Sequence, residues 1–246
     1  FLKYLDFLKQ DGLADLNLLC FQYHEACRPS YDAIVVDEVQ DLTNVQLSLI
    51  LKTLRHPEKF ILCGDSNQIV HPNFFSWAAL KTLFYESRLK AGGEIIRILN
   101  TNYRNTPEVT HLANRLLLLK NARFGSIDRE SHYLVRPISE NHGRVEFLAD
   151  TDAVKREFDA RTSRSTQFAV LVMRPDDKEA AGRCFHTPLL FSIQEAKGLE
   201  YENIILFNFV SGSSAAFKEV TEGVEAADLK ADFSYARAKD KTDKSL

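Results

Sequence analysis

Hydrophobic and polar positions in the first third of the chain predict a strand–helix–strand unit. Residues 1–29 carry leucines at helical spacing, and residues 31–36 end in a β-branched run typical of a buried strand. Thr43 or Asn44 can cap the helix expected next, and residues 60–63 repeat the buried-strand pattern. A strand, a helix and a second strand in this order predict a parallel sheet.

The rest of the chain also alternates between strand and helix patterns. A charged stretch ending in Gly92-Gly93 is the best candidate for a domain boundary. Strands are expected at 94–99, 144–148, 168–173 and 203–209, and helices at 106–120 and 153–160. From 211 to 246 the residues become small, polar and charged, which is typical of a mobile tail. The pattern predicts an α/β protein with one domain over 1–90 and a second over 91–246.

Composition narrows the class of protein. Hydrophobic residues make up 45% and charged residues 26% of the 246 positions, which excludes a collagen-like repeat or a coiled coil. No apolar run approaches the roughly 20 residues of a membrane helix, so no membrane partner is expected. The net charge of −3 means that any contact with nucleic acid must come from a local basic track.

Cysteine usage and the first residue bear on the compartment and on how much of the protein is present. The four cysteines show no C-x-x-C spacing, so reduced thiols in the cytoplasm are expected. The chain starts at Phe1 without a signal-peptide pattern. We therefore expect a piece of a longer polypeptide, whose oligomeric state the sequence does not indicate.

Two polar clusters follow the first two predicted strands. Asp37 and Glu38 come directly after the strand at 31–36, and Gly64 to Gln68 follow the strand at 60–63. Ligands of an open parallel sheet bind outside the carboxyl ends of its strands. Carboxylates there can hold Mg²⁺ together with substrate phosphates, and a neighbouring acid can orient a water molecule. An ordinary acidic loop and a bare turn are the alternatives, but two clusters at one edge favour a shared ligand.

Four segments resemble motifs of the UvrD/Rep/PcrA-like superfamily 1 helicases. Residues 35–41 (VVDEVQD) resemble motif II, the Walker B box, and residues 62–69 (LCGDSNQI) resemble motif III. Residues 99–105 (LNTNYRN) are similar to motif IV, and residues 192–201 (SIQEAKGLEY) are similar to motif V. The motifs follow the family's order, and the ordered set is far more specific than any single member.

The resemblance implies an ATP-driven motor built from two RecA-like P-loop NTPase lobes, of which the first is incomplete in this sequence. Such a protein uses ATP and Mg²⁺, translocates on single-stranded DNA and unwinds duplexes at single-strand/double-strand junctions, with DNA repair as the expected setting. Its expected location is the cytoplasm, on the nucleoid in a bacterium.

The resemblance also implies roles for single residues. Asp37 would hold Mg²⁺ through a water molecule, Glu38 would activate the hydrolytic water, and Gln68 would sense the γ-phosphate. Arg104 would act as an arginine finger, and Glu200 would contact the ribose. The alternative for Arg104 is an exposed surface arginine.

Motif V and the aromatic residues after motif III would connect the nucleotide to the strand. Gly198 would lie beside the nucleotide, and Lys197 would contact the nucleic acid. Of Phe74, Phe75 and Trp77, one is expected to stack on a base while the others fill the core. Trp77 is the leading candidate, followed by Phe75.

Two motifs of the family do not occur in these 246 residues. The sequence contains no G-x-x-x-x-G-K-[ST] loop (Walker A) and no tyrosine-containing box that ends in Thr-Arg. The family places its phosphate loop before motif II, so we expect it upstream of Phe1 and expect this piece alone not to hydrolyse ATP. Only 87 positions separate residues 105 and 192, too few for the family's inserted 2B subdomain. Gln194 also stands where many relatives have histidine.

Two other functions stay open at this point. One is an RNA-directed superfamily 1 helicase, although the residues of motifs IV and V are more similar to those of the DNA-directed branch. The other is a helicase-like docking or regulatory module without ATPase activity. The missing motifs favour this module, whereas the presence of Asp37, Glu38, Gln68 and Arg104 argues against it.

Overall fold

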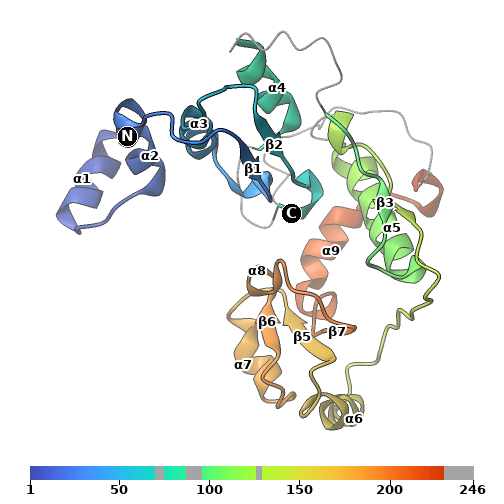
Figure 1. The fold of residues 1–246 in the computed structure, drawn as a ribbon. Coiled ribbons are helices and arrows are strands. Elements are labelled where there is room, and N and C mark those ends of the chain that lie inside the picture. The colour runs from blue at the N-terminus through green and yellow to red at the C-terminus, as the bar shows by residue number, and fades with distance from the viewer. Residues whose placement is uncertain (70–74, 87–95, 126–128, 230–246) are drawn as a thin grey trace. The chain divides into compact units, whose positions relative to one another are not determined.

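The computed structural model describes residues 1–69, 75–86, 96–125 and 129–229 (Figure 1). The chain divides into two compact units, which are treated separately. Unit 1 comprises Phe1–Leu99 and Ser126–Tyr133, and unit 2 comprises Asn100–Gly125 and Leu134–Leu246. The sequence pattern did not predict that residues 126–133 belong to unit 1, although they follow a segment of unit 2. In the described part of the chain, no helix is both long and apolar enough to cross a bilayer.

Unit 1 contains the strand–helix–strand unit that the sequence predicts. Its elements are α1 (Leu2–Gln10), α2 (Leu16–Ala26), β1 (Ile34–Val36), η1 (Val39–Asp41), α3 (Asn44–Lys52), β2 (Phe60–Leu62), η2 (Ser66–Gln68), α4 (Trp77–Glu86) and η3 (Arg129–Ser131). β1 and β2 pair in parallel, with Ile34 opposite Phe60 and Val36 opposite Leu62. The predicted parallel sheet is therefore confirmed for this pair.

The start of α3 follows from a capping box. The Thr43 hydroxyl accepts a hydrogen bond from the Gln46 N–H, and the Gln46 side chain accepts one from the Thr43 N–H. This reciprocal arrangement satisfies two donors that a helix start otherwise leaves unpaired. Leu47 then points into a core that Val39, Phe75 and Leu80 complete.

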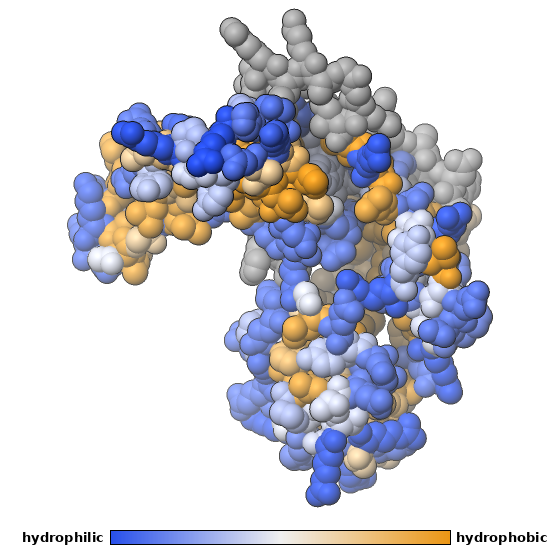
Figure 2. Space-filling model, viewed as in Figure 1, coloured by the Kyte–Doolittle hydropathy of each residue, from blue (hydrophilic) through white to orange (hydrophobic). Residues whose placement is uncertain are grey.

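One face of the β1–β2 sheet is open to solvent. Val35 and Ile61, which lie opposite each other in the register, are 70% and 60% exposed. The apolar surface continues over α1 and α2, as the orange areas of Figure 2 show. Parallel sheets are usually covered on both faces. The described residues of unit 1 cover only one.

Unit 2 is also α/β. Its elements are β3 (Thr101–Asn102), α5 (Pro107–Phe124), β4 (Arg136–Pro137), α6 (Asp152–Thr162), β5 (Phe168–Val172), α7 (Asp177–Gly182), β6 (Leu190–Ser192), α8 (Ile193–Ala196), β7 (Asn203–Leu206), η4 (Ser211–Ser213), α9 (Ser214–Thr221) and η5 (Ala226–Asp228). Three strands form a parallel sheet in the order β6-β5-β7, and β3 pairs in parallel with β4. Val170, Val172 and Phe207 anchor its core. The small parallel sheets confirm the mixed α/β class.

Three expectations for unit 2 differ from the structure. Residues 144–148 form no strand, since Val145 and Phe147 are exposed and pair with no neighbouring strand. Residues 96–99 are irregular, and pairing begins only at Thr101, while 94 and 95 lie outside the described residues. The expected tail contains α9, which contacts α5 and half-buries Phe217 and Val220. These apolar residues lie three positions apart and therefore share one helical face. The many polar residues around them hid this helical pattern from the sequence analysis.

Candidate nucleotide site

The carboxyl ends of β1 and β2 are joined by backbone hydrogen bonds beyond the strands themselves. The Cys63 N–H donates to the Val36 carbonyl at 2.8 Å, and the Val39 N–H donates to the Cys63 carbonyl at 2.9 Å. The loop that carries Asp37 and Glu38 is therefore held directly against the end of β2. The two polar clusters of the sequence meet at one sheet edge.

Asp37 and Glu38 occupy a tight turn at this edge. Both are exposed, and the Glu38 N–H donates to Asp37 Oδ1 at 2.9 Å. Glu38 has φ of 51° and ψ of 40°, in the left-handed region that residues other than glycine rarely adopt. Such a conformation is costly and is kept where the surrounding contacts enforce it.

A buried amide connects the two clusters. Gln40 is fully buried; its Nε2 donates to Glu38 Oε2, and its Oε1 accepts from the Asp65 N–H at 3.0 Å. Gly64 lies so close that an added Cβ would collide with Gln40 Oε1 and come within 2.8 Å of Val39 Cγ1. The motif reading did not assign Gln40 a role. The residue type alone gave no signal for this role, because a glutamine in a loop is equally compatible with solvent.

Asp65 links this amide to Gln68. The Gln68 Nε2 donates to Asp65 Oδ2 at 2.8 Å, and the Asn67 N–H donates to Asp65 Oδ1 at 2.8 Å. The structure thus brings Glu38 and Gln68 into one hydrogen-bonded chain through Gln40 and Asp65. Asp65 is a second residue whose part in the site the sequence analysis missed.

The segment that returns to unit 1 packs against motif III. The buried hydroxyls of Ser66 and Ser131 lie 2.5 Å apart, and Lys81 of α4 forms an ion pair with Glu130. Burial, with a smaller contribution from the negative charge of Asp65, raises the pKa of Tyr133 to about 12. The smaller contribution shows that Tyr133 lies near enough to Asp65 to feel its charge.

The donor set at this edge suits a magnesium ion only in part. Asp37 offers an exposed carboxylate, the kind of group through which Mg²⁺ is held together with phosphates and water. Within the described ranges, no group of three or more His, Cys, Asp or Glu side chains converges as an all-protein metal site. The residues present fit the magnesium and water side of a nucleotide site, whereas the sequence contains no phosphate-cradling loop.

In unit 2, the structure pairs Arg104 of motif IV with Glu200 of motif V. Arg104 Nε lies 2.7 Å from Glu200 Oε1, and both side chains are largely exposed. Asn102 at the end of β3 accepts hydrogen bonds from the N–H groups of Arg104 and Asn105, each at 2.9 Å. This turn positions the backbone that carries the arginine.

Lys197 and Gly198 lie where α8 ends and the chain turns toward β7. Ser192 and Glu195 form a capping box at the start of α8, and Lys178 pairs with Glu195 at 2.9 Å. Gly198 has φ of +80°, which favours glycine, and open space surrounds it. Among the described residues, nothing lies within 4 Å of the position that a Cβ would take at Gly198.

The aromatic residues after motif III differ in exposure. Phe75 is 6% exposed and packs edge-to-face on Trp77, with ring centroids 5.2 Å apart. Phe75 belongs to the core with Val39 and Leu47, so neither face of its ring is available to a base in this structure. Trp77 is half-buried against the same core, and Phe74 lies outside the described residues.

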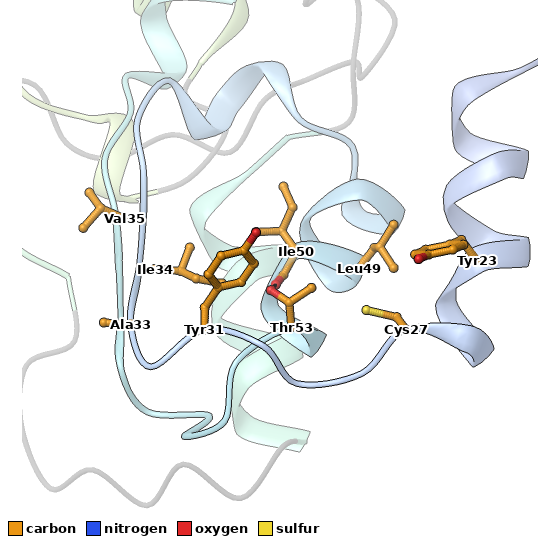
Figure 3. A pocket seen from close by; sticks show the side chains of 9 residues that line it. All are labelled: Tyr23, Cys27, Tyr31, Ala33, Ile34, Val35, Leu49, Ile50 and Thr53. Carbon is orange, nitrogen blue, oxygen red and sulfur yellow. Dashed lines mark hydrogen bonds between the residues drawn. The ribbon is translucent and has the colours of Figure 1, made fainter.

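An apolar groove of about 480 Å³ lies between α2, β1 and α3 (Figure 3). Its lining residues are Tyr23, Cys27, Tyr31, Ala33, Ile34, Val35, Leu49, Ile50 and Thr53. None of these side chains carries a positive charge, so the groove does not suit the phosphates of a nucleotide. The sheet edge remains the candidate site.

A family model matches the first third of the chain. The model of the UvrD/REP helicase N-terminal domain matches residues 5–83, a range that contains Asp37, Glu38 and Gln68. This part of the chain is UvrD/Rep-like, and the resemblance inferred from the motifs is confirmed.

Individual relatives agree with this class over parts of their length. ATP-dependent DNA helicase UvrD2 of Mycobacterium tuberculosis is 32% identical over 99 residues, which cover 40% of this chain and 14% of that protein. DNA helicase II of Escherichia coli is 29% identical over 126 residues, 46% of this chain and 17% of that protein. The human TPR and ankyrin repeat-containing protein 1 is 27% identical over 225 residues, 84% of this chain and 7% of that protein. The chain thus spans less than a fifth of each relative.

Proposed function

We propose that the chain is part of an ATP-dependent DNA helicase and forms the part of its site that activates water and senses the γ-phosphate. Asp37 would hold Mg²⁺, and the ion would neutralise phosphate charge when bound. Glu38 orients the attacking water and accepts its proton, and Gln68 contacts the γ-phosphate. The observation that carries this proposal is the meeting of the two clusters at the carboxyl edge of β1 and β2.

The proposal gives unit 2 the part of a second RecA-like lobe. Arg104 stabilises charge on the transferred phosphoryl group, and Glu200 contacts the ribose beside Gly198. Their 2.7 Å ion pair supports this assignment, because it keeps both groups on one surface of unit 2. Lys197 and Trp77 contact the nucleic acid.

Single-stranded DNA is the proposed activator, with junctions to duplex DNA as the substrate for unwinding. The Escherichia coli and mycobacterial relatives are named as DNA helicases, which supports DNA over RNA. Comparing single-stranded DNA with single-stranded RNA as activators of ATP hydrolysis tests this choice. Activation by RNA alone would assign the protein to RNA.

A docking or regulatory module without ATPase activity is the second candidate. The human relative that matches most of this chain is named for its TPR and ankyrin repeats, and the match covers 7% of it. A segment similar to this chain therefore occurs within a protein whose name records TPR and ankyrin repeats and no helicase. Under this alternative, Asp37 and Glu38 have no catalytic part.

The decisive experiment is ATP hydrolysis by the full-length protein with and without single-stranded DNA. The Glu38→Gln variant is expected to lose turnover by roughly 10²-fold or more, because a general base of this kind contributes about 10²–10⁴-fold. The matched control is Glu58→Gln, an exposed glutamate just before β2, at the opposite end of that strand from the site. Folded wild-type protein that shows no turnover with DNA would favour the docking module.

A further inference from the structure

The Gln40 amide is placed between the two halves of the proposed site. It is fully buried, donates from Nε2 to the Glu38 carboxylate and accepts at Oε1 from the Asp65 N–H at 3.0 Å. A carboxylate only accepts hydrogen bonds and a backbone N–H only donates. The partners therefore fix the orientation of the amide, because a flipped amide would face each of them with the wrong group.

The surroundings leave this amide little freedom. Gly64 has no room for a Cβ because Gln40 Oε1 and Val39 Cγ1 occupy the space. Buried side chains in such close packing keep one rotamer, and a buried amide without its partners would be costly. The position of Gln40 is thus set by packing and by both hydrogen bonds together.

Two further hydrogen bonds extend the connection to Gln68. Asp65, whose N–H is held by Gln40, accepts from the Gln68 side chain through Oδ2 and from the Asn67 N–H through Oδ1. Glu38 and Gln68 lie in different loops, yet Gln40 and Asp65 join them. A movement of Gln68 would therefore reach Glu38 through Asp65, by its side chain and its backbone N–H, and then through the Gln40 side chain.

We propose that Gln40 is a positioning residue that holds the Glu38 carboxylate in register with Gln68. Gln40 is fully buried and acts through Glu38, whose carboxylate accepts its hydrogen bond. The inference rests on the proposed function, because it concerns the alignment of the group that activates water. Misplacing a catalytic group by about 1 Å can cost on the order of 10²-fold in rate.

The test uses the full-length protein, single-stranded DNA at saturation and the variant Gln40→Met, which keeps the side-chain length but removes both hydrogen bonds. We expect kcat to fall by about 10- to 100-fold, with the KM for ATP changed less than about threefold. Gln40→Asn, an amide one methylene too short to span both partners, is expected to lose kcat to a smaller degree. The matched control is Gln46→Met, which removes a half-buried amide from the α3 capping box and is expected to lower stability but not kcat.

A double-mutant cycle separates positioning from a general structural role. In the Glu38→Gln background, measured by single turnover, Gln40→Met is expected to change the residual rate less than about threefold. Equal losses in both backgrounds, or wild-type kcat in Gln40→Asn and Gln40→Met, would overturn the inference. Wild-type protein that does not hydrolyse ATP, or that is indifferent to Glu38→Gln, would instead overturn the proposed function and with it this inference.

Discussion

Residues at the ends of β1 and β2 whose types carry no catalytic group still stabilise the arrangement of the candidate site. Gly64 has neither a charge nor a hydroxyl, yet its missing side chain allows Gln40 to reach Asp65. The sequence identifies Asp37, Glu38 and Gln68 because their residue types and order match a motif. It does not reveal that Gln40 and Asp65 connect Glu38 to Gln68, because a glutamine in a loop is equally compatible with solvent.

Gly64→Ala is expected to destabilise unit 1 by about 1–3 kcal/mol, the range for overpacking a filled site. The added methyl group would displace Gln40 or Val39, both of which are fully buried. Urea unfolding measures the change. Gly182→Ala is the matched control, since its Cβ would make only an ordinary 3.8 Å contact with Leu190; equal loss in both variants would contradict the prediction.

At the scale of elements, some helices and strands are predicted by local sequence signals, whereas others depend on contacts with distant parts of the chain. The cap before α3, Pro107 at the first turn of α5 and the apolar run of β5 are all local, and the sequence predicts all three elements. Residues 144–148 have the alternation of a strand but no partner strand, and the structure leaves them irregular. A strand is stabilised by its neighbour, so its pattern alone is not sufficient.

Thr43→Ala removes the hydroxyl that caps α3 and is expected to lower the free energy of unfolding by about 1 kcal/mol. α3 joins the two strands of the site, so the effect belongs to unit 1 as a whole. Thermal unfolding of the variant gives the measurement. The control is Thr82→Ala in α4, where the hydroxyl donates to a carbonyl within the same helix and little change is expected.

Acid is expected to loosen the contact between α5 and the loop after β4. The Gly143 N–H and the His142 imidazole hold the Glu108 carboxylate and lower its pKa to about 2 from an ordinary 4.5. Because the pKa is lowered on folding, this contribution to stability is complete above pH 4.5 and is lost as the pH falls toward 2. Unfolding midpoints in urea between pH 6 and pH 2 should fall less steeply for Glu108→Gln. Glu219→Gln on α9 serves as the control and should follow the wild type.

On the scale of the whole molecule, the chain divides into two units that carry different motifs. Unit 1 carries the acids and Gln68, and unit 2 carries the Arg104–Glu200 pair. Each unit has its own buried cluster. A separate buried cluster in each unit is what two domains with their own cores show.

The 246-residue chain by itself is expected to show no measurable ATP turnover. The reason is physical: a phosphate loop of backbone N–H groups and a lysine supply most contacts to the β- and γ-phosphates, and this sequence contains no such motif. A steady-state phosphate-release assay on the purified chain, with single-stranded DNA, makes the measurement. Turnover that disappears in Glu38→Gln would contradict the prediction.

The sequence by itself determined the order of the first strand–helix–strand unit, the motifs at its strand ends and the UvrD/Rep-like character of residues 5–83. These features depend on residue types at short spacing, which a single chain displays directly. The tertiary structure decided that Gln40 and Asp65 connect the motifs, that Phe75 lies in the core and that 129–133 pack against motif III. Those outcomes depend on which side chains from distant parts of the chain come into contact. The periodicity of apolar residues indicates only which positions are buried and not which residues they contact.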